Sequence, residues 1–160
     1  MIYIEDLFRF LRKKNINFFT GVPDSVLKKT NNIFSKMKEN NHIIAANEGN
    51  ALAIAAGHYL ATKKIPLVYF QNSGLGNLIN PLTSVVHKNV YSTPMVFLIG
   101  WRGHPNTKDE AQHFLMGKIT TKLLKLINIK YQSLNNFQDL KKINLLINYS
   151  KKNNTPVAIL

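Results

Sequence analysis

Short apolar runs alternate with longer amphipathic segments along most of the chain. The first amphipathic segment, Tyr3–Lys14, places Leu7, Phe8 and Leu11 at helical spacing with charges between them. The apolar runs predict strands at Asn17–Thr20, His42–Ala46, Ile65–Phe70, Met95–Ile99, Ile129–Gln132 and Val157–Leu160. Further helices are predicted at about Val26–Met37, Gly49–Ala61, Asn77–His87, Met116–Ile127 and Phe137–Tyr149.

This order of elements predicts an α/β fold in one domain, residues 1–160. We expect a single open, mostly parallel sheet of about six strands with helices on both faces. Ligands of such sheets bind outside the carboxyl ends of the strands. Four loops with unusual polar residues leave those ends, and we expect them to converge: Gly21–Ser25, Asn47–Asn50, Gln71–Asn77 and Gly100–His113.

Glu48 stands between an apolar run, Ile43–Ala46, and a segment of small residues, Ala51–Gly57. The run predicts a buried strand and the small residues predict a helix. Desolvation at such a junction favours the neutral carboxyl, whereas the start of the helix favours its anion. A carboxyl balanced in this way can hold or release a proton near neutral pH, as acid–base chemistry requires. The alternative is that Glu48 only caps the helix.

The charge balance is strongly basic, with 21 Lys and Arg against 8 Asp and Glu, and there is no Cys. A disulfide framework and a thiolate site are therefore excluded. The charge favours an anionic small molecule, an acidic protein or nucleic acid as ligand. Because the Lys residues are scattered, without an aromatic–basic repeat, we expect no nucleic-acid binding. Without a membrane-length apolar run or a signal peptide, a cytoplasmic protein without membrane contact is expected.

Five short blocks carry a resemblance to a known family: Asn47–Ala51, Gln71–Asn77, Asn80–Ser84, Ile99–Gly103 and Asp109–His113. Together they resemble the pyrimidine-binding domain of thiamin-diphosphate-dependent 2-oxo acid decarboxylases. The chain is most like phosphonopyruvate decarboxylases, and next like the α subunits of sulfopyruvate decarboxylases. The resemblance implies that the chain helps convert 3-phosphonopyruvate to phosphonoacetaldehyde and CO2. Sulfopyruvate is the alternative substrate, and a non-catalytic interaction subunit of the same fold is a third reading.

The resemblance implies a catalytic role for Glu48, as the carboxyl that shares a proton with the ring nitrogen of the cofactor's aminopyrimidine. In the family that the chain resembles, the cofactor would supply a nucleophilic ring carbon for the 2-oxo group and a cationic ring that accepts the electrons when CO2 departs. The carboxyl at this position would favour the imino form of the aminopyrimidine, which activates that carbon. Small residues at Gly49, Ala51 and Ala53 are expected to allow close approach.

The resemblance also implies roles for the other loops. The loop after the third strand is expected to bind the cofactor's aminopyrimidine through Gln71, Asn72 and backbone groups of Ser73, Gly74 and Leu75.

In the first and fourth loops the implied roles concern the substrate. Asp24 and Ser25 are expected to face it, with N-capping as the alternative for Asp24. His113 is expected to act as a proton shuttle or anion contact beside Gln112.

Arg102 has two readings: its guanidinium binds a phosphonate or sulfonate, or it fixes its own loop by pairing with Asp109 or Glu110. Two departures fall in the same loop. The family pattern has Gly-Glu-Pro where this chain has Gly103-His104-Pro105, and a proline at the position of Ala111.

A second protein half is also implied, because the cofactor's diphosphate needs Mg²⁺ held by a Gly-Asp-Gly…Asn motif that this sequence lacks. We therefore expect no metal site in this chain. We expect a diphosphate-binding β subunit or domain that holds Mg²⁺, in a homo- or hetero-oligomer. An apolar surface around Ala51, Leu75 and Leu78 is expected to be left bare for this partner.

Overall fold

The computed structural model describes residues 3–160. Its described strands form one six-stranded sheet in the order β2-β1-β3-β4-β6-β5, and every neighbouring pair is parallel. The predicted α/β fold is therefore confirmed, with a sheet that is wholly parallel. The strands are β1 Phe19–Gly21, β2 His42–Ile44, β3 Leu67–Gln71, β4 Val96–Gly100, β5 Lys130–Gln132 and β6 Val157–Ile159.

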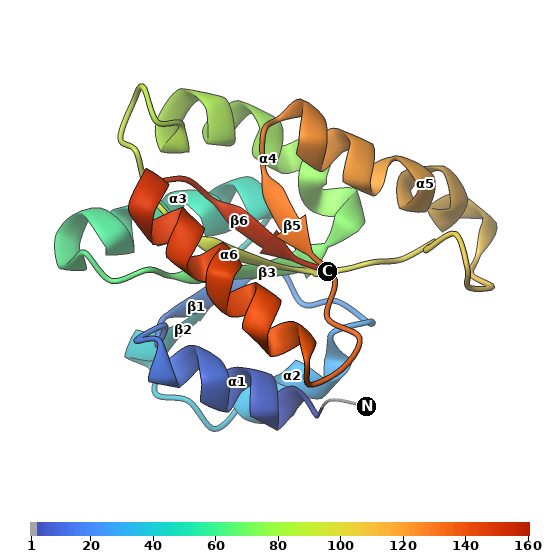
Figure 1. Cartoon of the computed structure of the whole chain (residues 1–160), viewed down its shortest axis with the longest axis horizontal. Helices are drawn as coiled ribbons and strands as arrows, with labels where there is room; N and C mark the ends of the chain where they lie inside the picture. The colour runs from blue at the N-terminus through green and yellow to red at the C-terminus, as the bar shows by residue number, and fades with distance from the viewer. Residues whose placement is uncertain (1–2) are drawn as a thin grey trace.

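Helices cover both faces of the sheet, and Figure 1 shows α4 and α5 above it and α1 and α2 below it. Alternate side chains of β3 pack on opposite faces of the sheet, because neighbouring residues of a strand point in opposite directions. Val68 and Phe70 pack with α3, α4 and α5, and Leu67 and Tyr69 pack with α1, α2 and α6. The helices are α1 Ile4–Lys13, α2 Lys28–Phe34, α3 Glu48–Thr62, α4 Leu75–Pro81, α5 Ala111–Leu126 and α6 Asp139–Asn153.

The strand order reverses its direction at β1, which lies between β2 and β3. The chain leaves β1 towards one edge of the sheet and, after β2, returns to the other side of β1. The connections α2 and α3 lie on opposite faces. A crevice opens at the carboxyl ends of strands at such a switch point, and it is the usual ligand site of open parallel sheets. The four predicted loops all leave these ends.

Two expectations about burial are wrong. The apolar run at β2 was predicted to be a buried strand, but β2 is an edge strand of the sheet and pairs with β1 alone. Ile43 and Ile44 are therefore 39% and 63% exposed. The apolar surface expected to be bare is also absent, since Ala51, Leu75 and Leu78 are all fully buried in the core formed by α3 and α4.

The segment after β3 differs from the single helix that the pattern predicts. It begins as a 3₁₀ turn, Asn72–Gly74, continues as α4 and ends as a π-helical stretch, Leu82–Val86. Pro81 ends α4 because it has no backbone N–H to donate. The hydroxyls of Thr83 and Ser84 donate to the carbonyl of Asn80, at 3.0 and 2.7 Å. The proline and these side-chain bonds explain the change of helix type.

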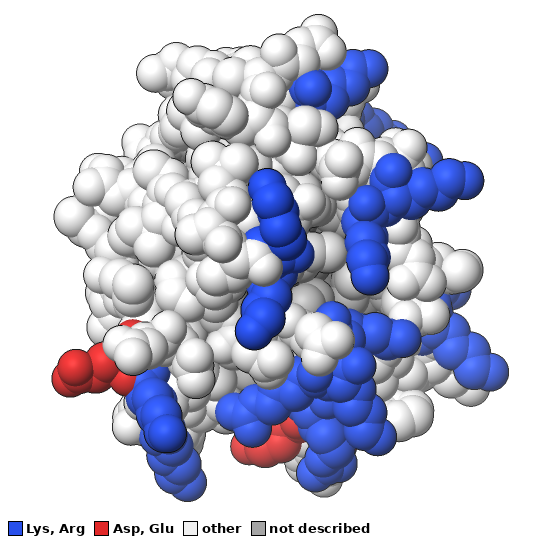
Figure 2. Space-filling view, turned by 90° about the vertical axis from the view of Figure 1, so that its left-hand side faces the viewer, with Lys and Arg blue, Asp and Glu red and all other residues white. Residues whose placement is uncertain are grey.

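Basic side chains gather on the side of the molecule from which the strands start (Figure 2). Cations occupy the last turns of three helices: Arg12 and Lys13 in α1, Lys125 in α5, and Lys151 and Lys152 in α6. Cations near the carboxyl end of a helix interact favourably with its dipole. Part of the +13 charge thus has a structural role. It lies at the amino ends of the strands, opposite the four loops.

Candidate active site

Asn47 caps α3, and this leaves Glu48 free for another task. The backbone of Asn47 is extended, and its side-chain Oδ1 accepts the N–H of Asn50 at 2.9 Å. This is the N-cap bond that satisfies an unpaired donor of the first turn. The alternative reading, in which Glu48 only caps the helix, is therefore wrong: the cap is the residue before it.

The carboxyl of Glu48 instead turns towards the loop after β3. The residue is only 9% exposed, and its Oε2 accepts the Nδ2–H of Asn77 at 2.7 Å. A Cβ at Gly74 would lie 2.4 Å from Oε1, so a glycine is required where the carboxyl rests on this loop. No described residue donates to Oε1, and this oxygen is not among the fully enclosed unpartnered atoms. One carboxyl oxygen thus remains available to a ligand.

Asn72 joins the loops after β3 and β4. Its Nδ2 donates to the carbonyl of Arg102 at 2.9 Å and to Oγ1 of Thr120 at 2.8 Å, while its Oδ1 accepts the N–H of Arg102 at 3.1 Å. The side chain of Asn72 is therefore committed to the framework. Nearby, Nε2 of Gln71 donates to Oγ of Ser73 at 2.8 Å. The cofactor-binding role of residues 71–75 stays a prediction.

Arg102 is held by Asp109 in the fourth loop, as one of its two predicted readings requires. Its Nε lies 2.9 Å from Oδ2 of Asp109, and its Nη2 lies 2.6 Å from Oδ1. The backbone N–H groups of Gly103 and Glu110 also donate to Asp109. The Arg102 hydrogen bond, with these backbone donors, holds the pKa of Asp109 well below its usual range. Asp109 is therefore the organising anion of this loop.

The same guanidinium reaches the first loop, since its Nη1 donates to Oγ of Ser25 at 2.9 Å. Asp24 lies beside them and is 8% exposed. Its Oδ2 accepts the N–H of Leu27 at 3.3 Å, as a cap would, and rests on the glycine at position 100. Its Oδ1 is buried without a hydrogen-bond partner among the described residues. The geometry is thus compatible with both the capping and the ligand-binding readings of Asp24.

His113 and Gln112 lie in the first turn of α5, where the fourth loop ends. His113 is half-buried, and its ring makes no hydrogen bond within residues 3–160. Gln112 is exposed and bonded to Glu110. Their predicted substrate roles stay predictions.

The substitution Asp109→Asn is expected to lower Tm at pH 7, because it removes the anion that holds Arg102. The pKa of Asp109 is lowered on folding, so its contribution is full above the unfolded value of about 4. It fades as pH falls towards the depressed folded value. Thermal unfolding of both proteins at pH 7, 5 and 3 tests this. A difference in Tm that does not shrink towards pH 3 would contradict it.

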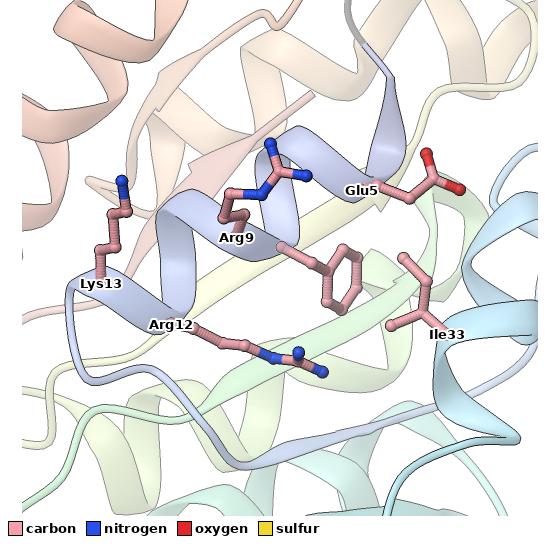
Figure 3. A pocket seen from close by; sticks show the side chains of 6 residues that line it. Glu5, Arg9, Arg12, Lys13 and Ile33 are labelled. Carbon is pink, nitrogen blue, oxygen red and sulfur yellow. The ribbon is translucent and has the colours of Figure 1, made fainter.

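A separate groove of about 520 Å³ lies between α1 and α2. Figure 3 shows Arg9 and Arg12 extending in different directions from α1, and Ile33 lying on α2 across the groove. Arg9 is paired with Asp6 at 3.0 Å. The lining includes none of the predicted site residues, so this groove does not belong to the site built around Glu48.

Sequence reasoning gave no role to Asn77 or Thr120, although both support the site. Asn77 lies within a block that carried the resemblance, but its contact with Glu48 spans 29 residues. Thr120 is an ordinary helical residue in the sequence, and its partner Asn72 is 48 residues away. Neither contact leaves a local pattern that could have predicted it.

The sheet is wholly parallel, and a nearly buried glutamate rests on the glycine-bearing loop after β3. Residues 1–124 match the family described as "Thiamine pyrophosphate enzyme, N-terminal TPP binding domain", and the chain belongs to this family. Its relatives are decarboxylases. Phosphonopyruvate decarboxylase from Streptomyces viridochromogenes is 39% identical over 131 residues, which cover 82% of this chain and 32% of that protein.

The α subunit of sulfopyruvate decarboxylase from Methanocaldococcus jannaschii is 33% identical over 155 residues, covering 96% of this chain and 89% of that subunit. The chain thus spans about a third of the phosphonopyruvate decarboxylases that it matches, but most of this α subunit. The thiamine diphosphate-dependent 4-hydroxybenzoylformate decarboxylase of Rhodococcus jostii RHA1 has the same fold. Its TM-score is 0.65 at 22% identity, covering 97% of this chain and 29% of that one.

Proposed function

We propose that this chain is the pyrimidine-binding half of a thiamin-diphosphate-dependent 2-oxo acid decarboxylase acting on 3-phosphonopyruvate. The observation that carries the proposal is the Glu48 carboxyl. It is nearly buried, does not cap its helix, and keeps one oxygen available beside Gly74. Membership in the thiamine pyrophosphate enzyme family and the decarboxylase relatives support the same conclusion.

The residues around Glu48 fit an aminopyrimidine. A ring nitrogen that shares a proton needs one carboxyl oxygen, and Oε1 of Glu48 accepts no bond from the described residues. Gly74 has no side chain that would fill the space beside this oxygen. When bound, thiamin diphosphate supplies a nucleophilic ring carbon and an electron sink for decarboxylation. Glu48 would hold or release the proton at the ring nitrogen, and the low-dielectric surroundings strengthen this contact.

The first and fourth loops would bind the substrate. Oδ1 of Asp24 is a buried oxygen without a partner among the described residues, and it lies next to the strand end that carries Arg102. The guanidinium of Arg102 is largely committed to Asp109, with its Nη1 directed to Ser25. We therefore assign the substrate's phosphonate to the Nη1 edge of Arg102 and to Ser25, and not to a free guanidinium fork. His113 and Gln112 are the further residues that we propose for this contact.

The choice between phosphonopyruvate and sulfopyruvate rests on sequence blocks in the fourth loop. The Ile99–Gly103 and Asp109–His113 blocks favour phosphonopyruvate, whereas the match to most of a separate α subunit favours sulfopyruvate. Comparing kcat/KM for the two acids in the reconstituted enzyme would decide between them. If neither acid is turned over, the alternative of a non-catalytic interaction subunit gains support.

A second polypeptide or domain would hold the diphosphate and Mg²⁺. Support comes from relatives that are named as α subunits. Residues 3–160 contain no group of three or more His, Asp or Glu that could hold a metal ion. They also contain no helix long and apolar enough to cross a membrane.

The purified chain is expected to be inactive alone. With thiamin diphosphate, Mg²⁺ and 3-phosphonopyruvate, it should release no CO2 above the background, because residues 3–160 contain no group of three or more His, Asp or Glu that could hold the metal. Adding a diphosphate-binding partner should restore release of CO2 and form a complex on sedimentation. Turnover by this chain without any second polypeptide would refute the proposal that a partner holds the diphosphate and Mg²⁺.

A further inference from the structure

The amide of Asn77 in α4 is directed at the catalytic carboxyl. Asn77 is an exposed residue, yet its Nδ2 lies 2.7 Å from Oε2 of Glu48, which is a short distance for an N–H···O bond. A donor facing a carboxylate makes a charge-assisted bond, which is about twice as strong as a bond between neutral groups. This bond is the one hydrogen bond that the described side chains make to the Glu48 carboxyl.

Two glycines bring α4 close enough for this bond. A Cβ at Gly49, in the first turn of α3, would lie 3.1 Å from the backbone carbonyl oxygen of Asn77. A Cβ at Gly74 would collide with the Glu48 carboxyl, at 2.4 Å from its Oε1. Gly74 and Asn77 are three positions apart, a spacing that places residues on the same face of a helical segment. The carboxyl thus contacts both the Gly74 backbone and the Asn77 amide.

We propose that Asn77 is a positioning residue that fixes the Glu48 carboxyl for its proton exchange with the cofactor; this inference rests on the function proposed above. Asn77 occupies Oε2, so Oε1 is the oxygen presented to the pyrimidine nitrogen. The bond also restrains the side-chain torsions of Glu48. This restraint keeps the carboxyl in the position from which it can reach a ring atom at hydrogen-bond distance. Asn77 acts through Glu48 and touches neither the substrate nor the reacting carbon.

The contact itself can be tested in the chain without cofactor or partner. In ¹⁵N-labelled protein, the side-chain NH2 signals of Asn77 are expected to move when Glu48→Gln replaces the carboxylate acceptor with a neutral amide. Asn148, an exposed asparagine of α6, serves as the internal control, and its signals should stay in place. Asn77 signals that are the same in the wild type and in Glu48→Gln would overturn the inference.

The reconstituted enzyme provides the second test. Asn77→Ala is expected to lower kcat by about 10- to 100-fold, the usual effect of losing a hydrogen bond to a charged group. KM for the 2-oxo acid should stay unchanged. Asn77→Gln, which keeps an NH2 donor, should recover part of kcat, and Asn148→Ala should match the wild type.

The outcomes separate this inference from the proposed function. If Glu48→Gln keeps full activity, the proposed function fails whatever Asn77 does. If Glu48→Gln is inactive while Asn77→Ala keeps the wild-type kcat, the positioning role alone fails. Circular dichroism checks that each variant is folded, and because Asn77 is exposed, both of its substitutions are compatible with the fold.

Discussion

Glu48→Gln is expected to fold and assemble with a partner like the wild type, but to turn over its 2-oxo acid about 10²–10⁴-fold more slowly. This is the range for losing a positioned proton-transfer group. The amide keeps the size of the side chain and one hydrogen-bonding oxygen, so the packing against Gly74 is preserved. The deficit should appear in kcat and not in KM, because Glu48 faces the cofactor instead of the substrate.

Hydrogen–deuterium exchange at the cofactor's reactive ring carbon measures this step without the later ones. Exchange in the assembled Glu48→Gln enzyme should be slower than in the wild type. Glu39→Gln is the matched control, since Glu39 is an exposed glutamate outside the site and loses the same charge. Equally fast exchange in Glu48→Gln and the wild type would show that Glu48 does not activate the cofactor.

The sequence predicts the layers of this fold well because its strongest signals come from the centre of the sheet. The strands β3 and β4 are buried on both faces and therefore appear as continuous apolar runs. The edge strand β2 misled the same reasoning. Its run Ile43–Ile44 is apolar, but the position of a strand within the sheet is set by pairing with β1, which no local pattern records.

The loops of the candidate site were predicted, together with one contact, the pairing of Arg102 with Asp109. Each loop could be recognised from local residues, and the parallel sheet brings the loops together. The contacts that were not predicted join residues far apart in the sequence: Glu48 with Asn77, and Arg102 with Ser25. The Glu48–Asn77 pair depends on the close approach of α3 and α4, which Gly49 and Gly74 allow because they lack a side chain. The sequence alone does not show that these glycines lie at such a contact.

Gly117→Ala is expected to destabilise the fold strongly, because the added methyl group pushes α5 away from the fourth loop. A Cβ at Gly117 would lie 1.7 Å from the carbonyl oxygen of Gly103. Both sides of this contact are backbone, so no flexible side chain can give way. Gly103 itself has a φ of +66°, a conformation that favours glycine. We expect a loss of roughly 3 kcal/mol in the free energy of unfolding, the upper part of the range for overpacking.

Gly57→Ala is the matched control, because Gly57 is also a helical glycine but has no atom within 4 Å of an added Cβ. It should raise the free energy of unfolding by about 0.5–1 kcal/mol, since alanine is the better helix former. Urea unfolding followed by circular dichroism gives both values. The single tryptophan adds a local probe, because Nε1 of Trp101 donates to the Gly117 carbonyl at 2.9 Å. Gly117→Ala should change its fluorescence in the folded state, whereas Gly57→Ala should not. If the two substitutions have equal effects on stability and fluorescence, the close approach of Gly117 to Gly103 does not hold the fourth loop in place.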